Sequence, residues 1–139
     1  MTMERKFAIV EKKFDYKGHE CICIFNQLGF RCGYVSVIEN KEFITYDIDC
    51  HCGLTFNGEL SSDCEPKYKY YIGFDCGHIC DKQDLEQAYK YELITETEYM
   101  FHKAVCNQIG DFSGVVRTLE YVEEQCKAIV EQLEKQGIK

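Results

Sequence analysis

The pattern of hydrophobic and polar residues divides the chain into a strand-like first part and a helical last part. Residues 19–25 alternate, with Cys21 and Cys23 on one face and Ile22 on the other, which is typical of a β-strand. After a turn-like segment, the apolar run over residues 30–38 predicts a second strand that forms a hairpin with the first. By the same criteria we predict shorter strands over residues 7–10, 53–56 and 68–74.

Apolar residues take on helical spacing from Asp81 onward. Asp81 is predicted to cap a helix that runs through Lys90. Thr95 opens a second helix, with Glu98 as its partner in a capping box, and Gly110 ends it. The sequence therefore predicts two helices between the last strand and the C-terminal segment.

The last predicted helix has the most regular pattern in the chain. Ser113 is expected to cap its start and Gly137 its end. Its apolar residues are spaced alternately four and three apart: Val115, Leu119, Val122, Cys126, Ile129 and Leu133. This pattern favours an amphipathic helix that lies on a sheet. A helix that also mediates dimerisation is the alternative, so both a monomer and a homodimer stay open.

Strands followed by helices indicate the α+β fold class. We predict a single domain over residues 1–139, with an antiparallel sheet in the N-terminal two-thirds and C-terminal helices packed on it. The strands that carry the candidate site span about residues 20–81, and the helical part spans about residues 82–137. A length of 139 residues fits one such domain.

The net charge of the chain restricts the kinds of molecule that it can bind. The net charge of −8 argues against direct binding to nucleic acid, which needs clustered Lys and Arg, but it permits binding to a basic protein surface. The sequence has neither a signal peptide nor a run of about 18 apolar residues, so we expect a cytoplasmic protein of a bacterial host with no membrane segment. In that reducing compartment, the ten cysteines are expected to be core thiols, metal ligands or reactive thiols.

Two short polar stretches, residues 49–54 and 75–81, hold the candidate chemistry. Each abuts an apolar, strand-like run, and together they contain four of the ten cysteines and two of the four histidines. Zinc prefers Cys sulfur and His nitrogen, usually as four ligands in a tetrahedron. Because the ends of neighbouring strands can meet, these stretches predict a zinc site.

Strand alternation restricts which residues can serve as ligands. Residues two apart on a strand share a face, so Cys76 and His78 can bind one ion together. Cys50 and Cys52 share the face opposite His51, so either His51 or that thiol pair faces the site unless the backbone is irregular there. We favour His51. The predicted zinc ligands are Cys32, His51, Cys76 and His78.

The fourth ligand stays open between Cys32, Asp81, Cys80 and Asp75. Of these, Asp75 is better suited to orient a histidine N–H group from behind the ligands. Sequence signatures of catalysis are absent: we find no H-x-E with P-C-x-x-C, no H-E-x-x-H, no G-x-S-x-G and no phosphate-binding glycine loop. We therefore expect a structural zinc and no enzymatic activity.

Three blocks of the sequence resemble a family of small proteins encoded by phages and mobile elements. The blocks are CGYV at residues 32–35, HCGLTF at residues 51–56, and IGFDCGH at residues 72–78 continuing to Asp81. The family's pattern is a CGYVGV strand, an HGGLT(F/Y) segment and a GFDCAHAGD segment. Here Ser36, Cys52 and Cys80 stand where that pattern has glycine, which adds two thiols near the site.

Among such mobile-element proteins, the chain resembles a streptococcal-type anti-CRISPR metalloprotein that inhibits a type II RNA-guided nuclease. The resemblance implies zinc at the shared motif, with His51, Cys76 and His78 as matching ligands, and a type II CRISPR effector nuclease as partner. Binding to a basic surface of that nuclease would block DNA loading or activation. Acidic candidates for the contact are Glu92, Glu96, Glu98, Glu120, Glu123 and Glu124.

Two other functions remain open from the sequence. One is a phage-derived, zinc-dependent hydrolase or nucleotide-processing enzyme. The other is a small metal-stabilised interaction module with a different partner.

Overall fold

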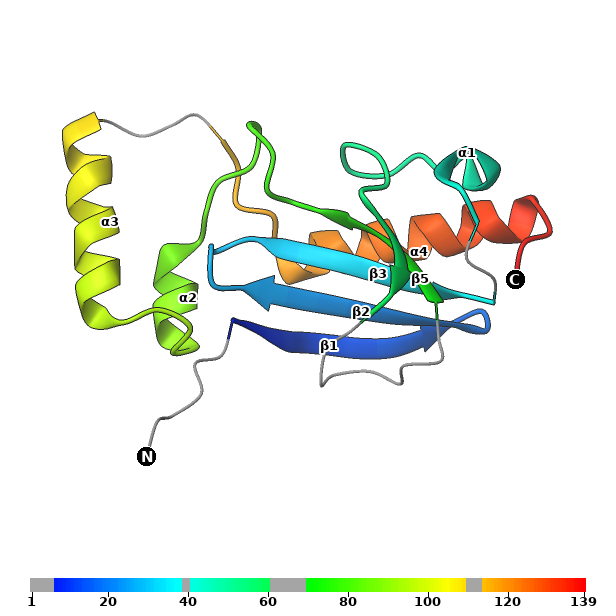
Figure 1. Ribbon diagram of the computed structural model, residues 1–139, viewed down its shortest axis with the longest axis horizontal. Coiled ribbons are helices and arrows are strands. Elements are labelled where there is room, and N and C mark those ends of the chain that lie inside the picture. The colour runs from blue at the N-terminus through cyan, green and yellow to red at the C-terminus, as the bar shows by residue number, and fades with distance from the viewer. Residues whose placement is uncertain (1–6, 39–40, 61–69, 110–113) are drawn as a thin grey trace.

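A five-stranded antiparallel sheet forms the centre of the molecule within the residues that the computed structural model describes, which are 7–38, 41–60, 70–109 and 114–139. The sheet has the order β1-β2-β3-β5-β4, and helix α4 lies along one face (Figure 1). The strands are β1 (Ala8–Tyr16), β2 (His19–Asn26), β3 (Arg31–Val37), β4 (Phe56–Glu59) and β5 (Tyr70–Asp75). The helices are α1 (Phe43–Tyr46), α2 (Leu85–Lys90), α3 (Glu96–Ile109) and α4 (Leu119–Lys135). The predicted α+β class is confirmed, and so is the hairpin of β2 and β3.

The alternating side chains of β2 pack on both faces of the sheet, as the sequence predicted. Cys21 and Cys23 are fully buried in the core cluster between the sheet and α4, together with Cys126 of that helix. Ile22 lies on the opposite face and packs in a second cluster with Tyr71. The two thiols of this strand are therefore part of the hydrophobic core.

Helix α4 is the amphipathic helix that the spacing predicted. It buries Val122, Cys126, Ile129, Val130 and Leu133. It begins later than expected because Thr118 caps it by accepting a backbone hydrogen bond from the first turn. Val115 instead forms a single parallel bridge with Asp81, while Ser113, the predicted cap, lies outside the described residues. Gly137 follows the helix with a φ of 72°, as expected of a C-terminal cap.

Helices α2 and α3 pack together at one end of the sheet (Figure 1). The predicted capping box at the start of α3 is confirmed, because the Glu98 and Thr95 backbone N–H groups each donate to the other's side chain at 3.1 Å. Helix α2 is capped by Asp84, so the prediction that Asp81 caps it is wrong. The Asp81 carboxylate is engaged elsewhere. Gly110, the predicted end of α3, lies outside the described residues.

The segment before β5 departs most from the prediction. Strand β4 covers Phe56–Glu59, so it overlaps the predicted strand over residues 53–56 only at Phe56. The preceding residues form a turn instead of a strand, with the Gly53 N–H donating to the Cys50 carbonyl at 2.9 Å. The short helix α1 in front of this turn was not predicted. The turn matters for function because it sets the direction of the side chains between residues 50 and 53.

Candidate metal centre

Two loops at the same end of the sheet carry the site. One leads into β4 and contains His51 and Cys52, and the other follows β5 and contains Cys80. Cys52 has a φ of 54° and Gly53 a φ of 84°, so the backbone here is left-handed rather than extended. Strand alternation does not apply to such a turn. The expected choice between His51 and Cys52 therefore does not arise, and both side chains reach the same place.

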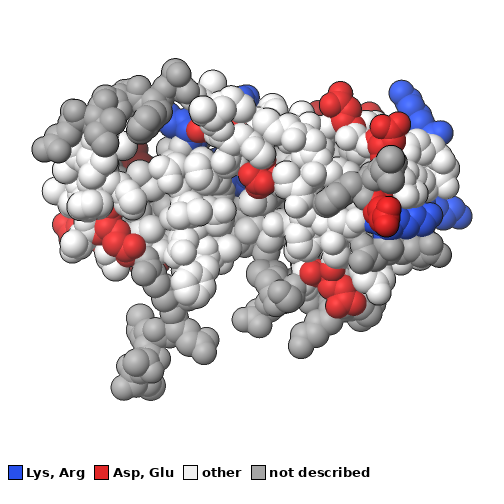
Figure 2. Space-filling model, turned by 45° about the horizontal axis from the view of Figure 1, so that its top comes forward, with Lys and Arg blue, Asp and Glu red and all other residues white. Residues whose placement is uncertain are grey.

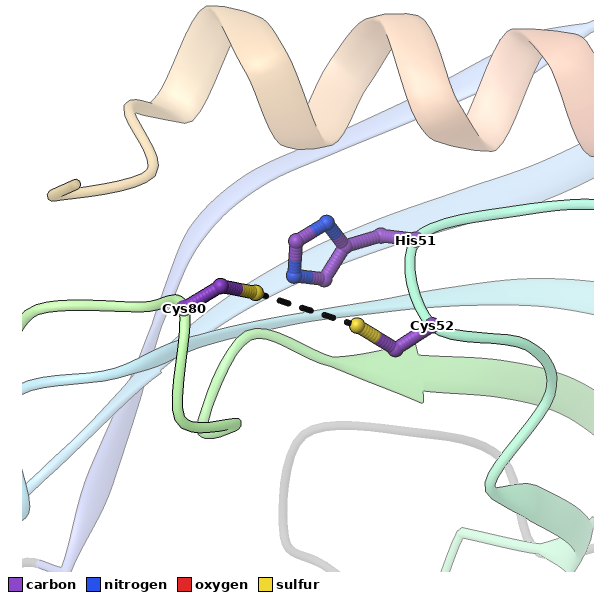
Figure 3. A group of neighbouring side chains, drawn as sticks. All are labelled: His51, Cys52 and Cys80. Atoms are coloured by element: carbon purple, nitrogen blue, oxygen red, sulfur yellow. Dashed lines mark hydrogen bonds between the residues drawn. The ribbon is translucent and has the colours of Figure 1, made fainter. Parts of the chain in front are cut away.

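His51, Cys52 and Cys80 form a group in which one possible ligand atom from each residue lies within 4.8 Å of the other two. Figure 3 shows a ring nitrogen of His51 on the side of the two sulfurs, which are joined by the dashed line. The two Sγ atoms are 4.0 Å apart. His51 is 8% exposed, whereas both cysteines are exposed. Within the described part of the chain, these three residues are the only group of His, Cys, Asp or Glu side chains that lie close enough together to hold a metal ion.

The spacing of the group is suited to a metal ion, as a comparison with tetrahedral coordination shows. A tetrahedral zinc ion with sulfurs at about 2.3 Å holds them roughly 3.8 Å apart, and a sulfur and a nitrogen roughly 3.6 Å apart. The observed 4.0 Å between the Cys52 and Cys80 sulfurs is close to the first of these separations. The donor set of one imidazole and two thiols is also the chemistry that zinc prefers over calcium or magnesium.

A buried carboxylate lies directly behind the group. The Asp81 side chain is fully buried, and its Oδ2 atom lies 2.9 Å from His51 Nε2. Arg117 Nε donates to Asp81 Oδ1 at 2.8 Å, and the His78 backbone N–H donates to Oδ2 at 3.0 Å. Burial alone would raise the pKa of Asp81, but the hydrogen bonds from His51, Arg117 and the His78 backbone hold it below its ordinary value. Asp81 is therefore held as a carboxylate.

Helix α4 fixes the position of His51 from the other side. Tyr121 places its hydroxyl 2.7 Å from His51 Nδ1, and Gln125 Oε1 accepts from the His51 backbone N–H at 2.8 Å. The two ring nitrogens thus have different surroundings, with Nδ1 at the tyrosine and Nε2 on the side of Asp81. A histidine that binds a metal usually gives its second nitrogen to an oxygen partner. Tyr121 is placed to serve as that partner when Nε2 binds the ion.

The surroundings of Cys52 favour the protonated form of its thiol. Partial desolvation, the hydrogen bond with Cys80 and the charge of Asp81 raise the pKa of the Cys52 thiol above its ordinary value. A metal ion must displace the protons from its thiol ligands. Binding at this group would therefore release protons and strengthen as the pH rises.

The other three predicted ligands lie near the group but outside it. Cys32 and Cys76 are buried, and burial raises the pKa of both thiols, that of Cys32 to about 11. The ring centre of His78 lies 5.9 Å from that of His51. Its Nε2 atom is buried without a hydrogen bond from the described residues, 3.4 Å from Asp75 Oδ1. Ligation by Cys32, Cys76 and His78 stays a prediction, while His51 is the one predicted ligand in the group.

Sequence reasoning placed Cys80 only among the alternatives and set Cys52 aside. Both lie in the two polar stretches that hold the candidate chemistry, residues 49–54 and 75–81, and this was the sequence signal that pointed to them. No feature of the sequence predicted that Arg117, Tyr121 and Gln125 belong to the site. The local sequence does not show which face of a distant helix will contact a loop. The structure brings them to the site across 36 or more positions of sequence.

Comparisons of the chain with protein families, with curated proteins and with solved structures find no match. The described residues contain no helix with the length and apolar character needed to cross a lipid bilayer. What the site can do must therefore be inferred from its own residues. These are an imidazole, two exposed thiols and a buried carboxylate at the junction of two loops.

Proposed function

We propose that the protein is a zinc-stabilised, protein-binding inhibitor, with zinc held by His51, Cys52 and Cys80. The observation that carries this proposal is the convergence of one nitrogen and two sulfurs, from two separate loops, within 4.8 Å. A metal at this point joins the loop before β4 to the loop after β5. Fixing both loops keeps the surface around them in one shape, and a pre-shaped surface loses less entropy when it binds a partner.

Asp81 is the candidate to complete the coordination. It lies outside the group of three, yet it approaches two members: its Oδ2 atom is 2.9 Å from His51 Nε2, and its Oδ1 atom is 3.8 Å from Cys80 Sγ. Nitrogen and oxygen ligands of a tetrahedral zinc lie roughly 3.4 Å apart. With Asp81 as the fourth ligand the site is closed, as structural zinc sites are.

The partner we propose is a type II CRISPR effector nuclease, which the sequence blocks suggest. The net charge of −8 suits a basic protein surface. Among the acidic candidates, Glu92, Glu96, Glu120 and Glu124 are exposed, whereas Glu98 is used in the α3 capping box and Glu123 pairs with Lys12 at 3.0 Å. Figure 2 shows acidic side chains in separate groups over one face. On this face, several small acidic patches and not one large field are therefore available for contact.

Metal content and partner binding test the proposal in two steps. Purified protein should contain one equivalent of zinc by elemental analysis, and His51→Ala should contain far less. Wild-type protein should then capture the purified nuclease in a pull-down, with or without guide RNA, and slow DNA cleavage. A protein that binds zinc but captures no nuclease at moderate salt would leave the metal site standing and remove the proposed partner.

A zinc-dependent hydrolase is the second candidate, and one observation favours it. The group supplies three ligands, and its two sulfurs are exposed. Three protein ligands with one open position are the arrangement of catalytic zinc. In that case Asp81 would serve a bound water and not the metal. Zinc-dependent turnover of a nucleotide or ester substrate, lost in Cys80→Ser without loss of folding, would favour this candidate over the inhibitor.

A further inference from the structure

We propose that Cys52 and Cys80 are a redox pair whose disulfide and whose metal complex exclude each other. This inference rests on the proposed zinc site and adds a form of regulation to it. The two sulfurs lie 4.0 Å apart, at van der Waals contact, and they come from two different loops. Formation of a bond of about 2.05 Å needs the sulfurs to approach by roughly 2 Å, which rotation of the two exposed side chains can supply.

Exposure separates this pair from the other thiols. Among the nine described cysteines, Cys52 and Cys80 are the exposed ones, and the remaining seven are buried or half-buried. Cys23 and Cys126 also hydrogen-bond each other, but both are fully buried in the core. Oxidation requires access of the oxidant to a thiolate. A small oxidant can therefore reach the Cys52–Cys80 pair and not the Cys23–Cys126 pair.

A cation lies beside one of the two exposed sulfurs. The Arg117 guanidinium contacts the Cys80 thiol and is held in place by its 2.8 Å hydrogen bond to Asp81. Arg117 thereby helps to fix the position of the Cys80 sulfur beside Cys52. In the proposed sequence Cys80 is the thiol that reacts first and Cys52 is the thiol that resolves the product.

Hydrogen peroxide can oxidise the two thiols to a disulfide in two steps. The Cys80 thiolate attacks one peroxide oxygen, the O–O bond breaks, and hydroxide leaves, so that Cys80 becomes a sulfenic acid oxidised by two electrons. The Cys52 thiolate then attacks the Cys80 sulfur, the S–S bond forms, and a second hydroxide leaves. With the two thiol protons, both hydroxides become water. Overall, two thiols and one peroxide give one disulfide and two waters.

Disulfide formation removes two of the three zinc ligands at once. Neither sulfur of a disulfide can become a thiolate, which is the form that binds the metal, so only His51 of the group remains. Conversely, a bound zinc ion holds the two thiolates and blocks their reaction with each other. The oxidised chain keeps its two loops joined covalently at residues 52 and 80, while the metal is released.

Peroxide treatment with three readouts tests this inference. Zinc content is first measured on the reduced protein. The metal-free protein is then treated with hydrogen peroxide, digested without reduction and mapped by mass spectrometry. We expect a peptide link between Cys52 and Cys80, with a mass loss of two hydrogen atoms. We also expect at least a tenfold loss of zinc affinity and its recovery after dithiothreitol. Zinc loaded beforehand should slow formation of the link.

Two variants and one control complete the experiment. Cys52→Ser and Cys80→Ser should form no link, whereas Cys106→Ser, at a half-buried thiol that is not a member of the group, should form it as the wild type does. Peroxide that leaves Cys52 and Cys80 unlinked overturns the inference, as does an oxidised protein that binds zinc as tightly as the reduced one. If the reduced protein binds no zinc, the proposed function fails, and the peptide map of metal-free protein still decides whether the pair forms a disulfide.

Discussion

The thiols under α4 and the thiols of the loop cluster are the same residue type in two regions with opposite properties. Cys21, Cys23 and Cys126 are fully buried between the sheet and the helix, and burial raises the pKa of Cys21 to about 12. Such thiols pack as small apolar groups and are chemically inert. Cys52 and Cys80 lie exposed on loops, next to an imidazole and above a buried carboxylate. The surroundings of each cysteine, and not its position in the sequence, decide which chemistry it can perform.

The two regions also differ in what holds them together. The core is stabilised by apolar contacts, so its weak points are changes of volume. The loop cluster is built around Asp81, whose carboxylate accepts from Arg117 and the His78 backbone and contacts His51. Its weak points are changes of charge and of hydrogen bonding. The four predictions below separate the regions on this basis, in order of the expected loss of unfolding free energy.

The largest loss is expected for Gly33→Ala in the core. A Cβ atom at Gly33 would lie 2.5 Å from the Phe74 ring and 2.8 Å from Cys126 Sγ. Because Phe74 and Cys126 are buried, neither can move aside without disturbing the core, and overpacking of this kind costs about 3 kcal/mol. Urea unfolding of the metal-free protein measures the loss. A variant as stable as the wild type would show that the core is looser than these contacts indicate.

A loss of about 2 kcal/mol is expected for Asp81→Asn, because hydrogen bonds to a charged group contribute about 1.5–3 kcal/mol. The amide keeps the shape of the side chain but loses the charge that pairs with Arg117 at 2.8 Å. Asp49→Asn is the matched control, since Asp49 is exposed and its carboxylate has no hydrogen bond or ion pair with the described residues. Equal stability of the two variants, measured by urea unfolding, would contradict the central place of Asp81.

The paired substitutions Cys126→Ser and Cys80→Ser test the comparison of thiols directly. A hydroxyl buried at residue 126 costs about 1–2 kcal/mol, because it is desolvated in the core. The same change at exposed Cys80 should alter the stability of the metal-free protein by less than about 0.5 kcal/mol. Zinc binding should show the reverse order, with Cys80→Ser impaired and Cys126→Ser normal. Isothermal titration measures the zinc affinity, and thermal unfolding in a chelator measures the stability of the metal-free protein. If the two variants changed both quantities equally, the distinction between core thiols and loop thiols would be contradicted.

The smallest expected effect is a change of the unfolding free energy with pH in the acidic range. The folded-state pKa of Asp81 lies below its ordinary value of 3.8, so its contribution is fully present above that pH. The contribution is lost as the pH falls through the lower, folded-state pKa. The stability difference between wild type and Asp81→Asn should therefore be constant from pH 7 to about pH 5 and shrink below pH 3.8. Unfolding curves of both proteins across this range measure it, and a difference that grows in acid would carry the wrong sign.

The sequence was sufficient for elements whose pattern is periodic. The alternation in β2 and the four-three spacing in α4 placed their buried faces correctly, because each face packs on one neighbour along its whole length. The site was harder to predict because Cys52 adopts a left-handed conformation, which a non-glycine residue seldom does. That single dihedral brings Cys52 to the same side as His51. Tyr121 and Arg117 complete the site only through the packing of α4 on the sheet, which no local pattern encodes.

X-ray absorption at the zinc edge of the purified, reduced protein tests the central claim most directly. The account predicts two sulfur ligands at about 2.3 Å and two nitrogen or oxygen ligands at about 2.0–2.1 Å. It also predicts one sulfur in Cys80→Ser, where binding persists, and two in Cys106→Ser. A zinc ion with no sulfur ligand, or one whose two sulfurs remain in both Cys52→Ser and Cys80→Ser, would contradict the assignment of His51, Cys52 and Cys80 as the metal site.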